Sequence, residues 1–328
     1  MTSSRRRFLA ASAGFVSAAL LSRHALAQSG KPIRLIVPFP AGGGTDVAAR
    51  LVADKLRGAL PQPVIVENKP GAAGRIAVEY VKSSDPDGST LLFTPDFLMV
   101  VYPHSFKKLS YDPVADFVPV ANCALSTLAF SVGPAVPESV KTLSDFIQWC
   151  RANPKQAAYA STSAGATPHF VGVMLTRAAG VEITHVPYKG GAPAIQDLIG
   201  GQIASSINPV GEVLAYVKSG RLRVLATSGS RRSHFLPEVP TMMEAGYRDV
   251  VVETWIGILA PARTPAATVA RYNAAIGDAL KSGEVAEGYS KFGMDVFAQT
   301  PEAFAATIRA DLNRWGPVVK ASGFTAED

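Results

Sequence analysis

Three times along this chain a short apolar run ends in a turn of glycines and small polar residues, and helical periodicity follows at once. The three turns span residues 38–46, 161–169 and 186–193. A short apolar run that leads into a helix is typical of a strand buried on both faces of a sheet. The pattern predicts an α/β fold with right-handed strand–helix–strand units and a mostly parallel sheet.

The repeated units fall into two blocks without a flexible joint between them. Strands are expected at residues 33–37, 64–66, 91–94, 157–160, 183–186, 203–207 and 224–227. No linker rich in Ser, Pro or Gly separates the blocks, so we expect two lobes connected by segments that cross between them. The extended apolar segments 117–132 and 251–259 are the candidates for hinge strands. Residues 28–125 and 251–328 are then one lobe, and residues 126–250 are the other.

Residues 1–27 are typical of an export signal. Three arginines at 5–7 precede an apolar run at 10–21 and the sequence Ala-Leu-Ala at 25–27, which predicts cleavage near Ala27 and a periplasmic location. The run is too short to cross a hydrocarbon core of ~30 Å. Paired arginines before Phe-Leu resemble a twin-arginine signal, which exports folded proteins, and an ordinary secretory signal is the alternative.

The net charge gives no indication of a polyanionic partner. Of 32 basic and 26 acidic residues, four arginines and no acids lie in residues 1–27, so 28 basic residues face 26 acidic ones in the remainder. No basic stripe is interleaved with aromatic residues, which argues against nucleic-acid binding.

The metal-binding and thiol residues are few. The five histidines show no ligand spacing, so neither a metal nor another cofactor is expected. Cys123 and Cys150 could pair in an oxidising compartment, but a chain of this size does not need a disulfide. Two buried free thiols are the favoured interpretation, with pairing left open.

The turn at residues 38–46 has the chemistry of an anion site. Its glycines let main-chain amides approach a ligand, and free amides at a helix N-terminus attract anions. We expect Thr45 or Asp46 to cap the helix. The alternative is a tight turn that needs glycine only for its conformation.

Two more specific interpretations of this turn fit less well. A phosphate-binding P-loop needs a lysine after its last glycine, and here Thr45 follows. A dinucleotide fingerprint is closer, with Gly42, Gly44 and then Glu67 at the end of the next strand. Its third glycine would fall on Val47. An exported nucleotide-dependent oxidoreductase is therefore kept as the alternative function.

The second turn nearly spells the nucleophile elbow of a hydrolase, but it lacks the leading glycine before Ser161. His169 and Asp197 are the conceivable partners, yet a base on the following helix would point away from Ser161. We expect Thr167 to cap that helix. In the third turn, Tyr188 can supply an apolar wall with a hydroxyl donor.

The ordered motifs resemble one known family. The segments Pro-Phe-Pro-Ala-Gly-Gly-Gly-Thr-Asp at 38–46, Val-Glu-Asn-Lys-Pro-Gly-Ala-Ala-Gly at 66–74 and His-Val-Pro-Tyr-Lys-Gly-Gly-Ala-Pro-Ala at 185–194 are similar to the tripartite tricarboxylate transporter substrate-binding family, also called Bordetella uptake gene proteins. Further matches at 85–91, 111–120, 239–246 and 255–261 extend the resemblance over nearly the whole mature chain.

The resemblance implies a type 2 periplasmic-binding-protein fold, with two α/β lobes joined by two hinge strands around a ligand cleft. It implies a non-enzymatic, monomeric solute-binding protein that captures a small carboxylate by lobe closure for membrane transporter subunits or a sensor. A dicarboxylate, tricarboxylate, amino acid or aromatic acid all fit. The family often has serine where Ala166 stands, which removes one possible donor. The ligand-binding residues it implies are Phe39, Ala41, Gly42, Gly43, Thr45, Asp46, Ser161, Gly165, Thr167, His169, Tyr188, Gly190 and Gly191.

Overall fold

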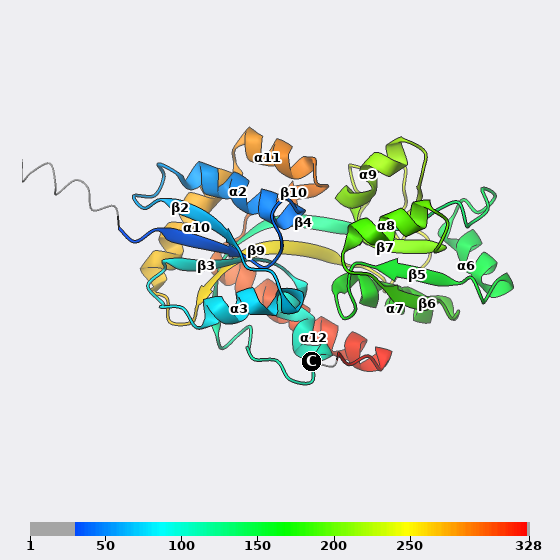
Figure 1. Cartoon of the computed structure of the whole chain (residues 1–328), viewed down its shortest axis with the longest axis horizontal. Coiled ribbons are helices and arrows are strands. Elements are labelled where there is room, and N and C mark those ends of the chain that lie inside the picture. Colours follow the sequence, from blue (N-terminus) through cyan, green and yellow to red (C-terminus); the bar gives the residue numbers. More distant parts are fainter. Residues whose placement is uncertain (1–29, 327–328) are drawn as a thin grey trace, which may run out of the picture.

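The computed structural model describes residues 30–326, so the predicted export signal lies outside the described residues. Within them, one ten-stranded mixed sheet has the order β2-β1-β3-β9-β4-β7-β5-β6, and β8 and β10 pair with β4. Figure 1 shows this sheet running through the length of the molecule with helices on both sides. The strands are β1 (Ile33–Val37), β2 (Val64–Asn68), β3 (Thr90–Pro95), β4 (Phe117–Val132), β5 (Ala158–Ser161), β6 (Thr184–Pro187), β7 (Ser205–Pro209), β8 (Arg223–Thr227), β9 (Glu253–Pro261) and β10 (Met294–Val296).

The helices divide between two halves of the molecule. We call the part built on β1, β2 and β3 the first half, and the part built on β5, β6 and β7 the second half (Figure 1). Helices of the first half are α2 (Gly44–Leu56), α3 (Arg75–Lys82), α4 (Phe97–Val100), α5 (Tyr102–Ser105), α10 (Ala266–Leu280), α11 (Gly283–Ser290) and α12 (Pro301–Ser322). Helices of the second half are α6 (Leu143–Ala152), α7 (Thr167–Ala179), α8 (Gly191–Ile199) and α9 (Val210–Lys218).

The long strand β4 belongs to both halves. Its residues from Phe117 to Thr127 pair with β9, and its residues from Leu128 to Val132 pair with β7 and β8. The predicted hinge segments therefore coincide with β4 and, shifted by two residues, with β9. The exact lobe boundaries at 125/126 and 250/251 stay a prediction.

The outer strands are parallel, as the sequence predicts, but the centre is not. β1 pairs in parallel with β2 and β3, and β5 does so with β6 and β7. In contrast, β4 pairs antiparallel with β7, β8, β9 and β10. The prediction of a mostly parallel sheet misses this centre. The chain enters the second half along β4 and returns along β9, so these two strands must run in opposite directions.

The central strands are buried because helices cover both faces of the sheet. Ile36, Leu92 and Phe93 have no exposed surface. Full burial of such a side chain stabilises the fold by about 1.5–3 kcal/mol. Cys123 and Cys150 are buried and free, and they lie in separate apolar clusters. Their burial raises the pKa of both thiols, for Cys150 to about 12.

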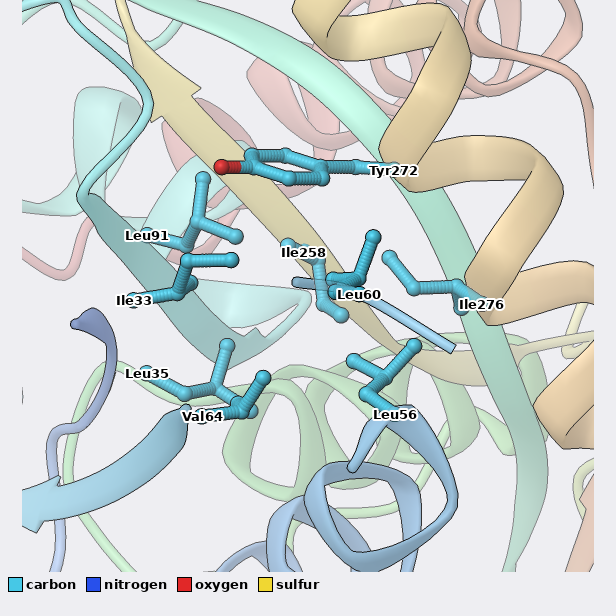
Figure 2. Close-up of a pocket in the computed structure, with 9 residues that line it drawn as sticks. All are labelled: Ile33, Leu35, Leu56, Leu60, Val64, Leu91, Ile258, Tyr272 and Ile276. Carbon is cyan, nitrogen blue, oxygen red and sulfur yellow. The ribbon is translucent and has the colours of Figure 1, made fainter. Parts of the chain in front are cut away.

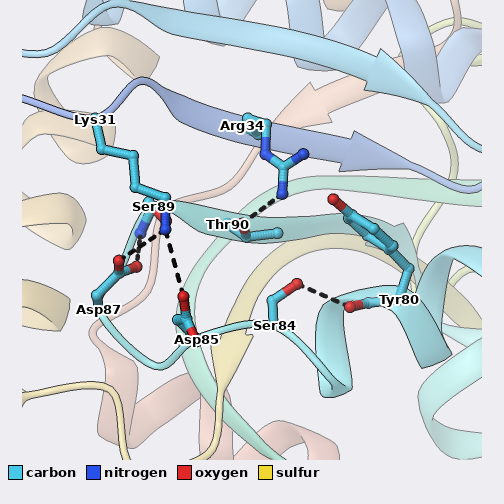
Figure 3. A network of polar contacts seen from close by, with 8 residues as sticks. All are labelled: Lys31, Arg34, Tyr80, Ser84, Asp85, Asp87, Ser89 and Thr90. Atoms are coloured by element: carbon cyan, nitrogen blue, oxygen red, sulfur yellow. Dashed lines mark hydrogen bonds and ion pairs between the residues drawn. The ribbon is translucent and has the colours of Figure 1, made fainter.

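Charged groups at the amino ends of β1 and β3 pair with one another. Nζ of Lys31 lies 3.0 Å from a carboxylate oxygen of Asp87 and 3.5 Å from one of Asp85 (Figure 3). The amide of Ser89 donates to Asp87 at 2.8 Å, which closes the turn between α3 and β3. These charges therefore have a structural role at the end of the sheet opposite to the glycine turns, which follow the carboxyl ends of the strands.

Two helix starts differ from the sequence prediction. The N-cap of α2 is Gly43 and that of α7 is Ala166, both with extended backbone, so Thr45, Asp46 and Thr167 lie inside their helices. The backbone is still extended at Gly43 and Ala166 and becomes helical at the next residue, so each helix begins before the capping residue that the sequence predicts. Helix α9 and the short strand β10 escaped sequence analysis altogether.

Candidate ligand-binding site

The turn between β1 and α2 presents main-chain amides at the start of the helix. No side chain caps α2 at Gly43. The first N–H groups of a helix have no partners within the helix, and they carry the positive end of its dipole. The amides from Gly43 to Thr45 are therefore positioned to donate to an anion.

Asp46 holds this turn from inside. Its Oδ2 accepts hydrogen bonds from the Gly42 amide and from Nε of Arg50, both at 2.9 Å. Its Oδ1 accepts from Nδ2 of Asn68 at 2.8 Å. Burial alone would raise the pKa of the Asp46 carboxyl, but the hydrogen bonds from Arg50, Gly42 and Asn68 lower it. Both oxygens thus accept donors of the protein, and Asp46 fixes the shape of the turn.

Aromatic rings connect the first turn with the second. Nδ2 of Asn68 donates to the carbonyl of Phe39 at 2.9 Å, which fixes the turn before its glycines. The ring of Phe39 lies 6.1 Å from that of Phe97, which lies 5.3 Å from that of Tyr102. Burial raises the pKa of Tyr102 to about 12, and the nearby side chain of Ser163, in the second turn, opposes this shift. The first and second turns therefore border the same region.

Two stacked imidazoles and a buried serine organise the second turn. Oγ of Ser161 donates to the carbonyl of Ser163 at 3.0 Å and lies 2.7 Å from Nε2 of His185. The ring of His169 stacks on that of His185 with centroids 3.8 Å apart, and its Nδ1 accepts from the Gly165 amide at 3.2 Å. Desolvation lowers the pKa of His169 to about 4 and, with the neighbouring His169, that of His185 to about 3. Both rings are neutral at pH 7.

This geometry does not form a hydrolase triad. His185, rather than His169, contacts Ser161, and no carboxylate is hydrogen-bonded to His185 among the described residues. Asp197 accepts a hydrogen bond from the Tyr188 hydroxyl at 2.7 Å instead of orienting a histidine. Ser161 has no exposed surface. The second turn is therefore held by side chains that a nucleophile would need free.

The third turn is joined to the second by main-chain hydrogen bonds. The amide of Tyr188 donates to the carbonyl of Ser161 at 3.0 Å, and the amide of Gly190 donates to that of Thr162 at 2.9 Å. Desolvation and the hydrogen bond with Asp197 raise the pKa of Tyr188 to about 12. No side chain caps α8 at Gly190 or α7 at its own N-cap. The second half thus offers two uncapped helix starts side by side.

Glu212 lies against the start of α8. A Cβ atom at Gly191 would collide with the Glu212 carboxylate, so the two groups are in direct contact. Nδ2 of Asn208 donates to Oε2 of Glu212 at 3.0 Å. Desolvation raises the pKa of Glu212, although its side chain keeps contact with solvent. A raised pKa together with contact to solvent is expected for a side chain that lies in a concave site.

Phe292 completes a ring of contacts around the three turns. A Cβ atom at Gly44 would lie 3.5 Å from the Phe292 ring. A Cβ atom at Gly211, next to Glu212, would collide with the Phe292 carbonyl. We call these links the ring of contacts. Tyr102 connects the first turn with the second, Thr162 connects the second turn with the third, and Glu212 and Phe292 connect the third turn with the first.

Asp96 links the two halves beside this ring. Its buried carboxylate accepts a hydrogen bond from Oγ1 of Thr167 at 3.2 Å, which joins the end of β3 to the first turn of α7. Desolvation and the nearby Asp311 carboxylate raise the pKa of Asp96 to about 7. The hydroxyl of Thr167 is thus engaged across the boundary.

The structure brings the predicted site residues together at the carboxyl ends of β1, β5 and β6 and the first turns of α2, α7 and α8. Sequence analysis missed several residues of this region, because their positions depend on contacts that are distant in the chain. They are Asp96, Phe97, Tyr102, His185, Glu212 and Phe292.

Two hollows in the described residues lie elsewhere. One, of about 10 Å³, is enclosed by aliphatic side chains of the first half and the Tyr272 ring (Figure 2). It has room for no more than about one water, and the Tyr272 hydroxyl donates to the carbonyl of Gly88. The other is an open groove of about 520 Å³ at the end of α12, lined by His104, Lys320 and Phe324 among others. Neither hollow is lined by residues of the three glycine turns.

The described part of the chain contains no group of three or more His, Cys, Asp or Glu side chains arranged to hold a metal ion. Between residues 30 and 326, no helix combines the length and apolar character needed to span a bilayer.

Two α/β halves on a shared sheet, with the glycine turns between them, define the two-lobed fold of periplasmic binding proteins. The model of the tripartite tricarboxylate transporter family receptor matches residues 48–324. The chain belongs to this family, as its motifs predict. Family membership favours a solute receptor over the oxidoreductase alternative, and Glu67, which that alternative would place on a ribose, lies 3.7 Å from Arg34.

Relatives and solved structures agree with this assignment. Protein BugT of Bordetella pertussis is 35% identical over 294 residues, which are 89% of this chain and 90% of BugT. A Rhodopseudomonas palustris protein with adipate has a TM-score of 0.81 at 30% identity and covers 90% of this chain and 98% of its own. MatC from the same organism, with bound malate, has a TM-score of 0.78 at 30% identity and covers 88% and 98%.

Proposed function

We propose that this protein captures a small carboxylate between its two halves for a tripartite tricarboxylate-type transporter. One observation carries the proposal: the uncapped starts of α2, α7 and α8 lie around one ring of contacts that includes both halves. A ligand in contact with both halves favours the closed arrangement, because only closure offers both sets of amides. The relatives solved with adipate and malate support a carboxylate ligand.

The expected energies are sufficient for such capture. Removing a carboxylate from water costs several kcal/mol. Hydrogen bonds to a charged group contribute about 1.5–3 kcal/mol each, and a helix N-terminus adds about 0.3–2 kcal/mol. Three or four amide donors with two helix starts can offset the desolvation and leave the roughly 8 kcal/mol that micromolar affinity requires.

The decisive test is Gly43→Val with calorimetric titration of malate, adipate and 6-aminohexanoate. A Cβ atom at position 43 meets nothing closer than the Pro40 carbonyl oxygen at 3.8 Å, so the fold tolerates the change. The valine methyl groups would cover the amides, and we expect at least a 100-fold loss of affinity. The matched control is Gly283→Val at the first residue of α11, where a Cβ atom meets nothing within 4 Å. Unchanged affinity in Gly43→Val would refute the site.

We also propose the finer points that family membership supports. The protein is exported to the periplasm after cleavage near Ala27, acts as a monomer without catalysing a reaction, and delivers its ligand to membrane subunits or a sensor. The lobes divide near residues 125 and 250. Mass spectrometry of the exported protein tests the cleavage, and sedimentation tests the monomer.

A further inference from the structure

Glu212 is held as a hydrogen-bond acceptor at the ring of contacts. Oγ of Ser206 donates to Oδ1 of Asn208, which turns the amide nitrogen of Asn208 toward Oε2 of Glu212. Gly191 and Gly211 leave the space in which Glu212 reaches the start of α8, because a Cβ atom at either position would collide. The arrangement fixes where the carboxylate lies and which way it faces.

No cation of the described residues neutralises Glu212. It is absent from the ion pairs found between residues 30 and 326, and Oε1 has no hydrogen-bond donor there. The charge of Glu212 is therefore not balanced by a cation among the described residues. By contrast, the comparable carboxylate of Asp46 has Arg50 as a partner. Glu212 is also exposed enough for a small molecule to reach it.

The ring places Glu212 across from the proposed carboxylate site. Phe292 contacts Gly44 at the start of α2 with its ring and Gly211, next to Glu212, with its carbonyl. In the arrangement that we infer, a ligand whose carboxylate binds the amides of α2 has its other end near Glu212. A second carboxylate at that end would face a like charge, and an ammonium group would face its counter-ion.

We propose that Glu212 is a specificity-determining residue, which selects ligands with a carboxylate at one end and a protonated amine at the other and disfavours dicarboxylates. This inference rests on the proposed function. It narrows the ligand class to amino carboxylates whose ammonium group lies at the end opposite to the bound carboxylate.

The test uses matched ligands that differ only at the far end. A four-carbon set comprises succinate, 4-aminobutanoate and butanoate, and a six-carbon set comprises adipate, 6-aminohexanoate and hexanoate. An aromatic set comprises benzene-1,4-dicarboxylate, 4-(aminomethyl)benzoate and 4-methylbenzoate. Calorimetry measures each ligand with the wild type, with Glu212→Gln and with the control Glu302→Gln, which removes a carboxylate from the first turn of α12 away from the ring.

In the set that fits the site, we expect the wild type to bind the amino acid at least tenfold more tightly than the dicarboxylate. Glu212→Gln keeps the contact with Asn208 but removes the charge. We expect the affinity for the amino acid to fall at least tenfold and the affinity for the dicarboxylate to rise. The affinity for the monocarboxylate should stay within about twofold of the wild-type value. Glu302→Gln should match the wild type throughout.

Other outcomes overturn the inference. If Glu212 only plugs the site and every ligand displaces it, Glu212→Gln strengthens all members of a set equally. If the wild type prefers the dicarboxylate, the selection is refuted while carboxylate capture stands. If no ligand of any set binds the wild type, the proposed function fails first.

A second variant tests the position of the carboxylate. Gly191→Ala adds a methyl group that collides with Glu212, and the Gly191 backbone does not have a positive φ that would itself strain alanine. Displacing the carboxylate should reduce the preference for the amino acid as Glu212→Gln does. An unchanged preference in both variants would overturn the assignment.

Discussion

The first turns of α2 and α9 carry a carboxylate at the same third helical position, in the first half and the second half respectively. Asp46 in α2 accepts hydrogen bonds from an amide, a guanidinium and a side-chain amide, and its pKa is lowered. Glu212 in α9 accepts one hydrogen bond, from Asn208, and its pKa is raised. Both carboxylate oxygens of Asp46 thus accept hydrogen bonds from the protein, whereas among the described residues only one oxygen of Glu212 does.

The difference separates two roles that sequence alone does not distinguish. Asp46 is satisfied by its own surroundings, so its removal affects the fold. Glu212 has acceptor capacity left, so we expect its removal to affect what binds. The lack of a capping side chain does not by itself identify a site, since α10 and α11 lack one as well. What distinguishes the candidate site is that several such helix starts meet.

The largest expected effect is on stability, from Asp46→Ala. The change leaves the Gly42 amide and the Asn68 side chain without an acceptor, at about 1–3 kcal/mol each, whereas Arg50 is half exposed and contributes less. We expect a loss of about 2–4 kcal/mol in urea unfolding at pH 7. Because the folded pKa of Asp46 is lowered, the difference should be complete above pH ~4 and shrink as the pH falls through the folded value. A loss below about 1 kcal/mol would mean that the turn does not depend on Asp46.

Asp96→Asn extends the comparison to a carboxylate that lies between the halves. Its folded pKa is raised to about 7, above the ~4 of an unfolded chain, so the wild type loses stability as the pH rises from ~4 to about 7. Asp311 raises this pKa further, and Arg314 opposes it. Asparagine lacks the charge, and we expect it to stabilise the protein at pH 8 by about 1–3 kcal/mol. The gain in stability should disappear near pH 4. If thermal unfolding shows the same gain at pH 4 and pH 8, the pKa of Asp96 is not raised in the folded protein.

The smallest effect is expected for Glu212→Gln in the absence of ligand. Its raised folded pKa means that ionisation of Glu212 opposes folding above the unfolded pKa. The variant should therefore be more stable at pH 7 by at most about 1 kcal/mol, and the gain should fade below pH ~4.5. This pH dependence is opposite to that of Asp46→Ala. A clear destabilisation at pH 7 would give Glu212 a structural role and remove the contrast.

Sequence predicted the parts of this molecule that local rules determine. Apolar runs that end in turns located β1, β3 and β5 within one residue. The apolar segment at 117–132 coincided with β4. The motifs identified the family, and the glycines marked the turns that meet.

Contacts between distant parts of the chain could not be predicted in this way. Thr167 bonds to Asp96, which is 71 residues away, and Glu212 meets Gly191 from another helix. The start of α9 escaped because Pro209, before the helix, and Gly211, within it, are typical of a turn. Asp46 was predicted as a ligand contact because a polar residue after a glycine turn resembles one, yet both its oxygens bind the protein itself.

The uninterrupted course of β4 through both halves has a mechanical consequence. Parts that are tied only by loose loops can move freely, but here β4 continues across the junction as one strand, paired with β9 up to Thr127 and with β7 and β8 from Leu128 onward. In the proposed opening, β4 has to twist or bend where its partner changes from β9 to β7, between Thr127 and Leu128. We therefore expect the opening motion to have a small amplitude, because bending a continuous strand is opposed by the backbone hydrogen bonds on either side of the bend.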